Sequence, residues 1–227
     1  MLLKGKGIIS PLQKQVLEIL SSISDSSYFY LTGGTALAEF YFGHRRSYDL
    51  DIFTSEEKLV LPFSRVFENV LHQHSFIVDV IRRFSTFTEF QVANNNEPVK
   101  VQLAYDTPFR IEETYDSEIG IKVNSYKDII VDKLLAFVGR IEPRDAIDLF
   151  FILQKENIFD ITNLAAHKDP GFDLYWLAIA LEKTITFPDD IKRWPVEMIL
   201  QIDIKELQKT FHELSMSVMN KINKLNF

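Results

Sequence analysis

Hydrophobic and polar residues follow one another in two different patterns, which meet near residue 124. Between residues 11 and 23, apolar side chains recur about every 3.6 residues, and this period predicts an amphipathic helix. An aromatic run at 28–31 and the alternating residues at 49–53 both indicate short strands. Residues 35–42, which follow a pair of glycines, are typical of a short helix. The first part of the chain therefore mixes strands with helices.

A long helix and then three strands complete this first part. The pattern predicts the helix over residues 55–74, with a proline near its start. We expect the strands to form an antiparallel meander, because a turn of three asparagines separates the last two. The expected strands cover residues 76–81, 86–92 and 99–105, the turn covers 94–96, and a further short strand covers 119–123.

After residue 124 nearly every segment has helical periodicity. Ser125 and Asp128 resemble a capping box, which predicts the start of a helix. Pro143 suits the first turn of the next helix. Further helices are expected at 172–185, 195–201 and 203–224. The sequence thus predicts two domains, a mixed α and β domain over 1–123 and a helical domain over 124–227.

Composition and charge narrow the class of protein. The chain has 227 residues, of which 46% are hydrophobic, which is enough for a substantial core. Its net charge of −7 argues against non-specific binding to nucleic acid or anionic membranes, although a local basic site is still allowed. Cysteine is absent, which fits a reducing compartment. Apolar runs fall well short of the about 18 residues that a membrane span needs, so we expect a soluble cytoplasmic protein with no membrane partner.

The strongest chemical signal combines a glycine turn with two carboxylates. Asp49 and Asp51 lie two apart on an expected strand, so both side chains point to the same face of the sheet. Such a pair favours a bound hard cation such as Mg²⁺. Gly33 and Gly34 allow a phosphate to approach the backbone, and Thr35 adds a hydroxyl. Each feature alone is more often a plain turn or a solvated edge strand, but together they favour a metal–triphosphate site for phosphoryl or nucleotidyl transfer.

A second cluster of charged residues lies in the helical part. Lys133 and Arg140 are seven residues apart and share one face of a helix, while Arg144, Asp145 and Asp148 begin the next helix. The basic side chains are suited to neutralising a triphosphate. The alternative is a salt-bridged corner between two helices, and on this cluster alone we favour that alternative.

Both clusters resemble one known family. Residues 30–38 and 44–53 are similar to the AbiEii/AbiGii-type nucleotidyltransferase toxins, and residues 133–149 resemble the second motif block of that family. The similarity spans residues 12–155. It implies an α+β fold with a polymerase-β-like nucleotidyltransferase core, in which a mixed sheet is flanked by helices, followed by a helical C-terminal part. It also implies a bacterial toxin of a toxin–antitoxin or abortive-infection pair, with a cognate antitoxin.

The resemblance assigns roles to residues at matching positions. It implies metal binding by the two aspartates and catalysis by these together with three residues of the helical part. The catalytic set is Asp49, Asp51, Lys133, Asp145 and Asp148, and the metal ligands are Asp49 and Asp51. The nucleotide-binding set is Gly33, Gly34, Thr35, Arg45, Ser47, Lys133, Arg140 and Arg144. The expected cofactor is Mg²⁺, with Mn²⁺ as a substitute, and the substrate is an NTP.

One position departs from the superfamily pattern. A third carboxylate often lies on a later strand, but the matching slot of strand 99–105 holds Gln102. A neutral amide cannot accept a proton at neutral pH and is a weaker ligand for a hard cation. Either Asp145 or Asp148 takes its place, or the protein binds a nucleotide without efficient transfer.

We therefore predict a Mg²⁺-dependent nucleotidyltransferase that moves NMP from an NTP to an acceptor hydroxyl on RNA, most simply the 3′ end of tRNA. Transfer to a protein or a small molecule is the alternative within enzymes. A non-catalytic nucleotide-binding module is the alternative from another class. The sequence leaves open the base, the acceptor, the antitoxin and the oligomeric state.

Overall fold

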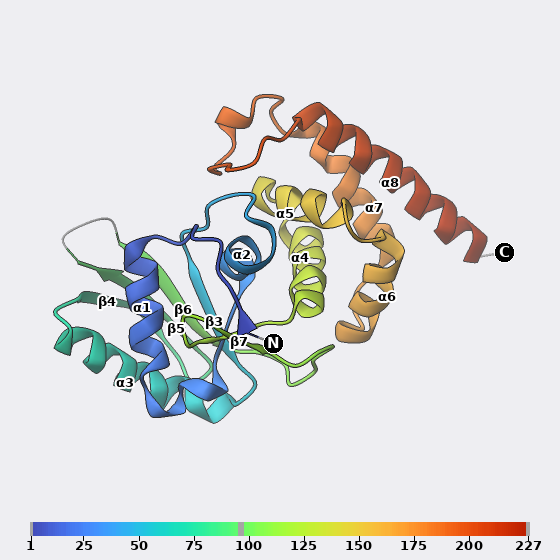
Figure 1. Cartoon of the computed structure of the whole chain (residues 1–227). Helices are drawn as coiled ribbons and strands as arrows, with labels where there is room; N and C mark the ends of the chain where they lie inside the picture. The colour runs from blue at the N-terminus through green and yellow to red at the C-terminus, as the bar shows by residue number, and fades with distance from the viewer. Residues whose placement is uncertain (1, 95–97, 226–227) are drawn as a thin grey trace. The chain divides into compact units, whose positions relative to one another are not determined.

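The computed structural model describes residues 2–94 and 98–225 of the chain. Contacts within the chain divide it into a first unit, Met1–Ile129, and a second unit, Ile130–Phe227. Figure 1 shows the sheet in the first unit and the helices of the second. Part of the expected asparagine turn, residues 95 and 96, lies outside the described residues. The domain boundary predicted after residue 123 stays a prediction.

The first unit is built on one mixed sheet of eight strands. The strand order is β1-β7-β8-β2-β3-β6-β5-β4. Parallel pairs join β1 to β7, β8 to β2 and β3 to β6, and the other neighbours are antiparallel. The strands are β1 (Leu2–Leu3), β2 (Tyr30–Thr32), β3 (Leu50–Thr54), β4 (Ile77–Arg83), β5 (Phe87–Ala93), β6 (Val99–Tyr105), β7 (Tyr115–Ser117) and β8 (Lys122–Val123).

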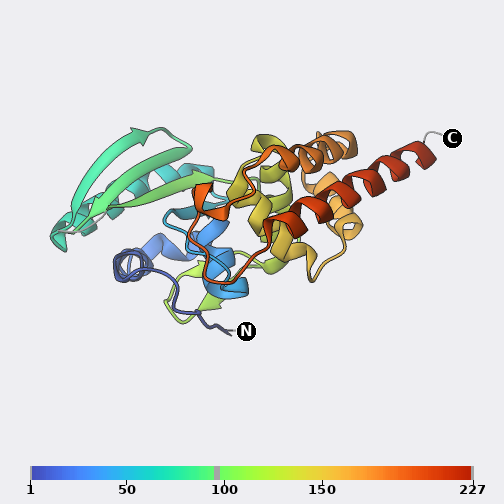
Figure 2. The same ribbon diagram turned by 90° about the horizontal axis from the view of Figure 1, so that it is seen from above.

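The expected meander is confirmed, since β4, β5 and β6 pair in antiparallel order. Figure 2 shows these strands as a long curved ribbon beside the helices of the first unit. With the flanking helices, this mixed sheet confirms the predicted α+β class. The strands expected at 28–31 and 119–123 are shorter in the structure and the one at 76–81 is longer, because hydrogen bonding to a neighbour, not local periodicity, decides where a strand ends.

Two amphipathic helices build the core on one face of the sheet. They are α1 (Pro11–Ser21) and α3 (Val60–Gln73), and α3 is preceded by a short 3-10 turn, Glu57–Leu59. The apolar residues of β3, Leu50 and Ile52, are fully buried. Phe67 of α3 packs edge-on against Phe90 of β5, with ring centroids 5.8 Å apart. Because this face is apolar, the alternate side chains of β3 point to the other face.

A tight turn connects β2 to the helix behind it. Gly33 has a φ of +69°, a conformation that strongly favours glycine. The helix α2 (Gly33–Ala36) begins there and continues as a π-helical segment, Leu37–Phe42. The short helix expected at 35–42 is therefore confirmed.

The second unit is helical, as predicted. Ser125 caps α4 through its hydroxyl, which accepts from the Asp128 amide at 2.9 Å, and Pro143 begins α5. The helices are α4 (Tyr126–Arg140), which begins in the first unit, α5 (Pro143–Leu153), α6 (Ile158–Lys168), α7 (Leu174–Lys183) and α8 (Ile204–Leu225). Over the described residues, no helix is long and apolar enough to cross a membrane.

The helix expected at 195–201 is wrong. These residues form bends, and the nearest helical turn is the 3-10 turn Ile191–Arg193. The Val196 amide donates to the Trp194 carbonyl at 2.8 Å, which closes a three-residue turn around Pro195. That bond competes with the pattern between residues four apart that an α-helix needs.

Candidate active site

The two aspartates lie where β3 begins. Asp51 is inside the strand and Asp49 directly precedes it. Both are partly exposed, whereas Leu50 between them is fully buried. The alternation of β3 thus places both carboxylates on the face opposite the core, as the sequence predicts.

The glycine turn lies against these carboxylates. A Cβ on Gly33 would lie 2.1 Å from Oδ2 of Asp51, which is far inside van der Waals contact. A Cβ on Gly34 would lie 2.8 Å from Nη2 of Arg45 and 2.9 Å from Oγ of Ser47. The turn therefore brings backbone close to one carboxylate and to two of the predicted nucleotide-binding side chains. Any side chain at either glycine would fill that space.

Buried hydrogen bonds hold the segment that leads into β3. The hydroxyl of Thr35, which is 1% exposed, donates to the Asp49 carbonyl at 2.5 Å. The side-chain amide of Gln13 donates to the Ser47 carbonyl at 2.8 Å. These bonds fix the backbone on which the first aspartate stands. Thr35 thus has a positioning role in the structure, and its contact with a nucleotide stays a prediction.

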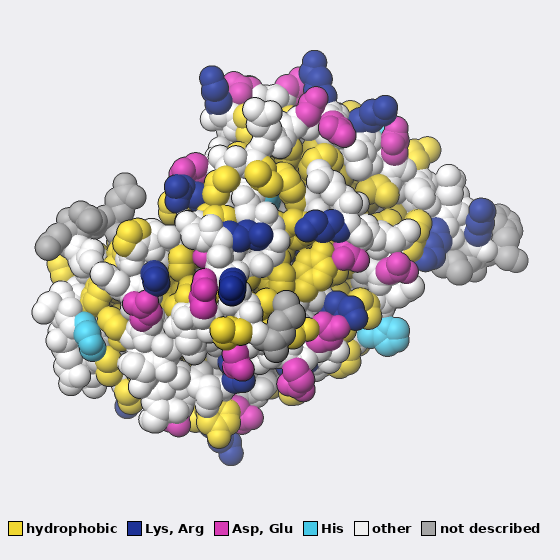
Figure 3. All heavy atoms as spheres, in the orientation of Figure 1, with side chains coloured by type: hydrophobic (Ala, Val, Ile, Leu, Met, Phe, Trp, Pro, Cys, Tyr) yellow, Lys and Arg dark blue, Asp and Glu magenta, His cyan; other side chains and the backbone are white. Residues whose placement is uncertain are grey.

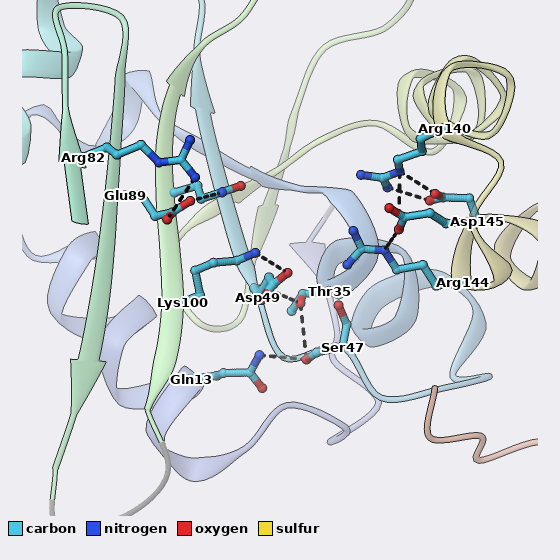
Figure 4. A network of polar contacts seen from close by, with 12 residues as sticks. Gln13, Thr35, Ser47, Asp49, Arg82, Glu89, Lys100, Arg140, Arg144 and Asp145 are labelled. Atoms are coloured by element: carbon cyan, nitrogen blue, oxygen red, sulfur yellow. Dashed lines mark hydrogen bonds and ion pairs between the residues drawn. The ribbon is translucent and has the colours of Figure 1, made fainter. Parts of the chain in front are cut away.

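Strands β4, β5 and β6 add polar side chains here, of which the sequence indicated only Gln102 as part of the site. Nζ of Lys100 lies 2.9 Å from Oδ2 of Asp49. The side-chain amide of Gln102 donates to Glu89 at 2.7 Å, and Arg82 lies 3.5 Å from the other oxygen of Glu89. Figure 4 shows Lys100 reaching toward Asp49, and Arg82 toward Glu89. These pairs depend on the register between strands, and local sequence patterns do not contain that register.

A second buried network supports the turn from behind. The Asn124 side-chain amide donates to the Thr32 hydroxyl at 2.9 Å, and the backbone carbonyl of Asn124 accepts from the Tyr41 hydroxyl at 2.7 Å. Burial raises the pKa of Tyr41 above its usual range, so the phenol keeps its proton and donates. Burial, and then the nearby Asp106, raise the pKa of Tyr30, whose hydroxyl donates to that carboxylate at 2.8 Å. The sequence did not indicate a role for Asn124, because an asparagine before a helix cap is typical of a loop.

A pocket of about 520 Å³ lies beside the start of α1. It is lined by the first residues of α1, by Tyr48, which precedes Asp49, and by Val99, which precedes Lys100. The Tyr48 ring is 56% exposed. An exposed aromatic ring is suited to stacking against a base.

The charged residues predicted in the helical part also gather, within the second unit. Lys133 lies 2.8 Å from Asp148 and 3.8 Å from Asp145, and Arg140 donates twice to Asp145, at 2.6 and 2.8 Å. Arg144 pairs instead with Glu142 at 2.8 Å. The cluster forms the salt-bridged helix corner that was the alternative interpretation. Its participation in nucleotide binding stays a prediction.

The donor set of the first unit fits a hard divalent cation. The two carboxylates lie on one face of the sheet, at the start of β3. Gly33 has no side chain, and its backbone lies close to the Asp51 carboxylate. Carboxylate oxygens are the ligands that Mg²⁺ takes, usually one or two together with substrate phosphates. Within the described ranges, no group of three or more His, Cys, Asp or Glu side chains is arranged to hold a metal. The protein's own contribution is therefore a pair of acids.

Comparisons with known proteins show the family of this chain. The family model "Nucleotidyl transferase AbiEii toxin, Type IV TA system" matches residues 15–210. An uncharacterized protein of Aquifex aeolicus is 30% identical over 190 residues, which cover 78% of this chain and 82% of that protein.

Solved structures show the same fold at low identity. JHP933 from Helicobacter pylori is 19% identical, with a TM-score of 0.59 over 95% of this chain and 92% of that one. MenT4, a nucleotidyltransferase toxin from Mycobacterium tuberculosis, is 12% identical, with a TM-score of 0.56 over 92% of this chain and 82% of that one. With the family match over most of its length, this chain belongs to the AbiEii family of nucleotidyltransferase toxins of type IV toxin–antitoxin systems.

Proposed function

We propose that this nucleotidyltransferase moves NMP from an NTP to a hydroxyl of RNA, at the 3′ end of tRNA, and that it depends on Mg²⁺. The observation that carries the proposal is the close approach of the Gly33 backbone to the Asp51 carboxylate, with Asp49 on the same face of β3. This arrangement places an acid pair beside a turn that a phosphate can approach. The proposed setting is the cytoplasm, where nucleotides and tRNA are found.

Different residues of the first unit would bind the cation and the triphosphate. Asp49 and Asp51 would hold the cation, which when bound neutralises charge on the phosphates. The Gly33–Gly34 turn would bind the triphosphate, and Arg45 and Ser47 lie against that turn. Thr35 and Gln13, through the bonds described above, would keep the start of β3 in place.

The reaction would be an in-line displacement. The acceptor oxygen forms a bond to the α-phosphorus, and the bond from that phosphorus to the bridging oxygen of pyrophosphate breaks. Pyrophosphate leaves with the electron pair of that bond. The hydroxyl proton passes to water, because Gln102 at the usual third-acid slot cannot accept it.

The surface charge favours specific recognition of RNA over non-specific attraction. Figure 3 shows Lys and Arg side chains interspersed with Asp and Glu on one face of the molecule. With a net charge of −7, broad electrostatic attraction to RNA is weak. The proposal therefore places recognition in local contacts near the site, and the exposed ring of Tyr48 is the candidate for stacking on a base.

The test is incubation of the purified protein with each α-labelled NTP, Mg²⁺ and total bacterial tRNA, resolved on a denaturing gel. We expect one NTP to label tRNA, and Asp51→Asn to reduce the rate on the order of 10³-fold. Asp116→Asn changes an exposed acid on β7 of the same sheet and should keep wild-type activity.

The outcomes separate the parts of the proposal. Labelling that persists in Asp51→Asn would show that the site assignment is wrong. If no RNA is labelled although NTP binds, the acceptor is a protein or a small molecule, and the RNA part of the proposal is wrong.

A further inference from the structure

The register of the sheet sets polar residues side by side on the face of the two aspartates. The parallel pairing of β3 with β6 places Asp51 opposite Gln102, and the antiparallel pairing of β5 with β6 places Glu89 opposite Gln102. Lys100 lies two residues before Gln102 and so shares its face. The ion pair of Lys100 with Asp49 confirms that these side chains meet.

The slot for a third acid is neutral, and the nearest carboxylate beyond it is already engaged. Glu89 accepts a hydrogen bond from Gln102 at 2.7 Å and lies within 3.5 Å of Arg82. Its side chain is only 9% exposed. An ionised carboxylate only accepts, so it holds the NH₂ of the Gln102 amide toward β5. Gln102 and Arg82 therefore hold the Glu89 carboxylate on the β4 and β5 side of the slot.

The ammonium group of Lys100 forms an ion pair with Asp49, one of the two predicted metal ligands. Nζ of Lys100 lies 2.9 Å from Oδ2 of Asp49, and the two side chains are 32% and 29% exposed. Sites that bind two divalent cations place them about 3.5–4 Å apart, bridged by shared acids. A second cation at Asp49 would come within repulsive range of the Lys100 ammonium. The Lys100 ammonium already offsets the charge of Asp49, which favours a single divalent ion at the pair.

We propose that Lys100 takes the place of a second cation in this enzyme. The site then binds one divalent cation with each nucleotide, held chiefly at Asp51, while Lys100 remains on Asp49 and supplies the other positive charge. This inference rests on the proposed function, because it assumes that the aspartates bind a cation and a nucleotide.

The first measurement counts ions. Full-length protein is saturated with a non-hydrolysable α,β-methylene NTP and titrated with Mn²⁺, and free Mn²⁺ is followed by electron paramagnetic resonance against nucleotide alone. We expect one Mn²⁺ in each protein–nucleotide complex. A count of two would overturn this inference and leave the proposed function standing. A failure to bind Mn²⁺ or nucleotide would overturn both.

The second measurement isolates the ammonium. Without nucleotide, Lys100→Met should bind Mn²⁺ about tenfold more tightly than wild type, because a like charge beside the cation is removed. Lys100→Arg keeps the charge and should match wild type. Lys122→Met removes the lysine of a more exposed ion pair with Asp116 on the same sheet and should also match wild type.

An unchanged or weaker affinity in Lys100→Met would show that the ammonium does not lie beside the cation, and the inference would be wrong. Urea unfolding of each variant shows whether it is folded before its affinity is compared. Lys100→Gln, which keeps a polar side chain, provides the same comparison if the methionine variant does not fold, and it too should bind Mn²⁺ more tightly than wild type.

Discussion

Two lysine–aspartate clusters in this chain differ mainly in their exposure to solvent. In the first unit, Lys100 and Asp49 are 32% and 29% exposed and lie at the start of β3. In the second unit, Lys133 is 8% exposed, and its partners Asp145 and Asp148 are fully buried. Both clusters contain a short ion pair, at 2.9 and 2.8 Å. The same chemistry therefore occurs in two different dielectric surroundings.

The difference teaches which cluster is available to a ligand. A partly exposed ion pair contributes little to stability, and a ligand can reach it from solvent. Breaking a buried pair leaves a charge without water or a partner, which is strongly destabilising. We therefore interpret the first cluster as chemical and the second as chiefly structural.

The largest effect on stability is expected in the second unit. Lys133→Met removes the ammonium that lies 2.8 Å from the fully buried Asp148, and it should lower the free energy of unfolding by about 3–5 kcal/mol. Urea unfolding followed by circular dichroism measures this change. A loss below about 1 kcal/mol would mean that the corner is not the structural element that its burial indicates.

The next effect is expected at the glycine turn. Gly33→Ala should lower the free energy of unfolding by about 1–3 kcal/mol and also abolish nucleotide transfer, because its Cβ would displace the Asp51 carboxylate. Gly7→Ala is the matched control, since Gly7 has a similar φ of +72° but nothing within 4 Å of its Cβ. Equal loss of activity in both variants would contradict the role given to the approach of Asp51.

A smaller effect is expected at the start of α4, the helix that carries Lys133. Ser125→Ala removes the hydroxyl that accepts from the Asp128 amide, and it should lower the free energy of unfolding by about 1 kcal/mol. Ser10→Ala, which removes the equivalent cap of α1, should have a similar effect. If Ser125→Ala matched wild type in the same urea titration, the cap would not stabilise this helix.

The smallest effect on stability is expected at Lys100. Lys100→Met should change the free energy of unfolding by less than about 1 kcal/mol, because its ion pair is screened by water. Its effect should appear instead in Mn²⁺ binding. A loss as large as that of Lys133→Met would remove the contrast between the two clusters.

The local sequence was sufficient for elements whose signals are short in range. The helical period of α1, the cap at Ser125 and the proline of α5 all predicted real helix starts. The alternation around Asp49 and Asp51 placed both acids on one face, because side-chain direction on a strand depends only on parity. The helix predicted at 195–201 was wrong because a local turn around Pro195 replaced the helix that a weak apolar pattern had indicated.

The sequence by itself thus determined the family, the mixed α and β class, and the pairing of a glycine turn with two carboxylates. Only the tertiary structure decided that Lys100 stands on Asp49, that Glu89 holds Gln102, and that Lys133 is buried against Asp148. These contacts join strands or helices whose register and packing depend on the whole fold. The sequence gives the charge of each side chain. The energy of that charge depends on its burial and its ion-pair partners, which are set only when distant segments pack together.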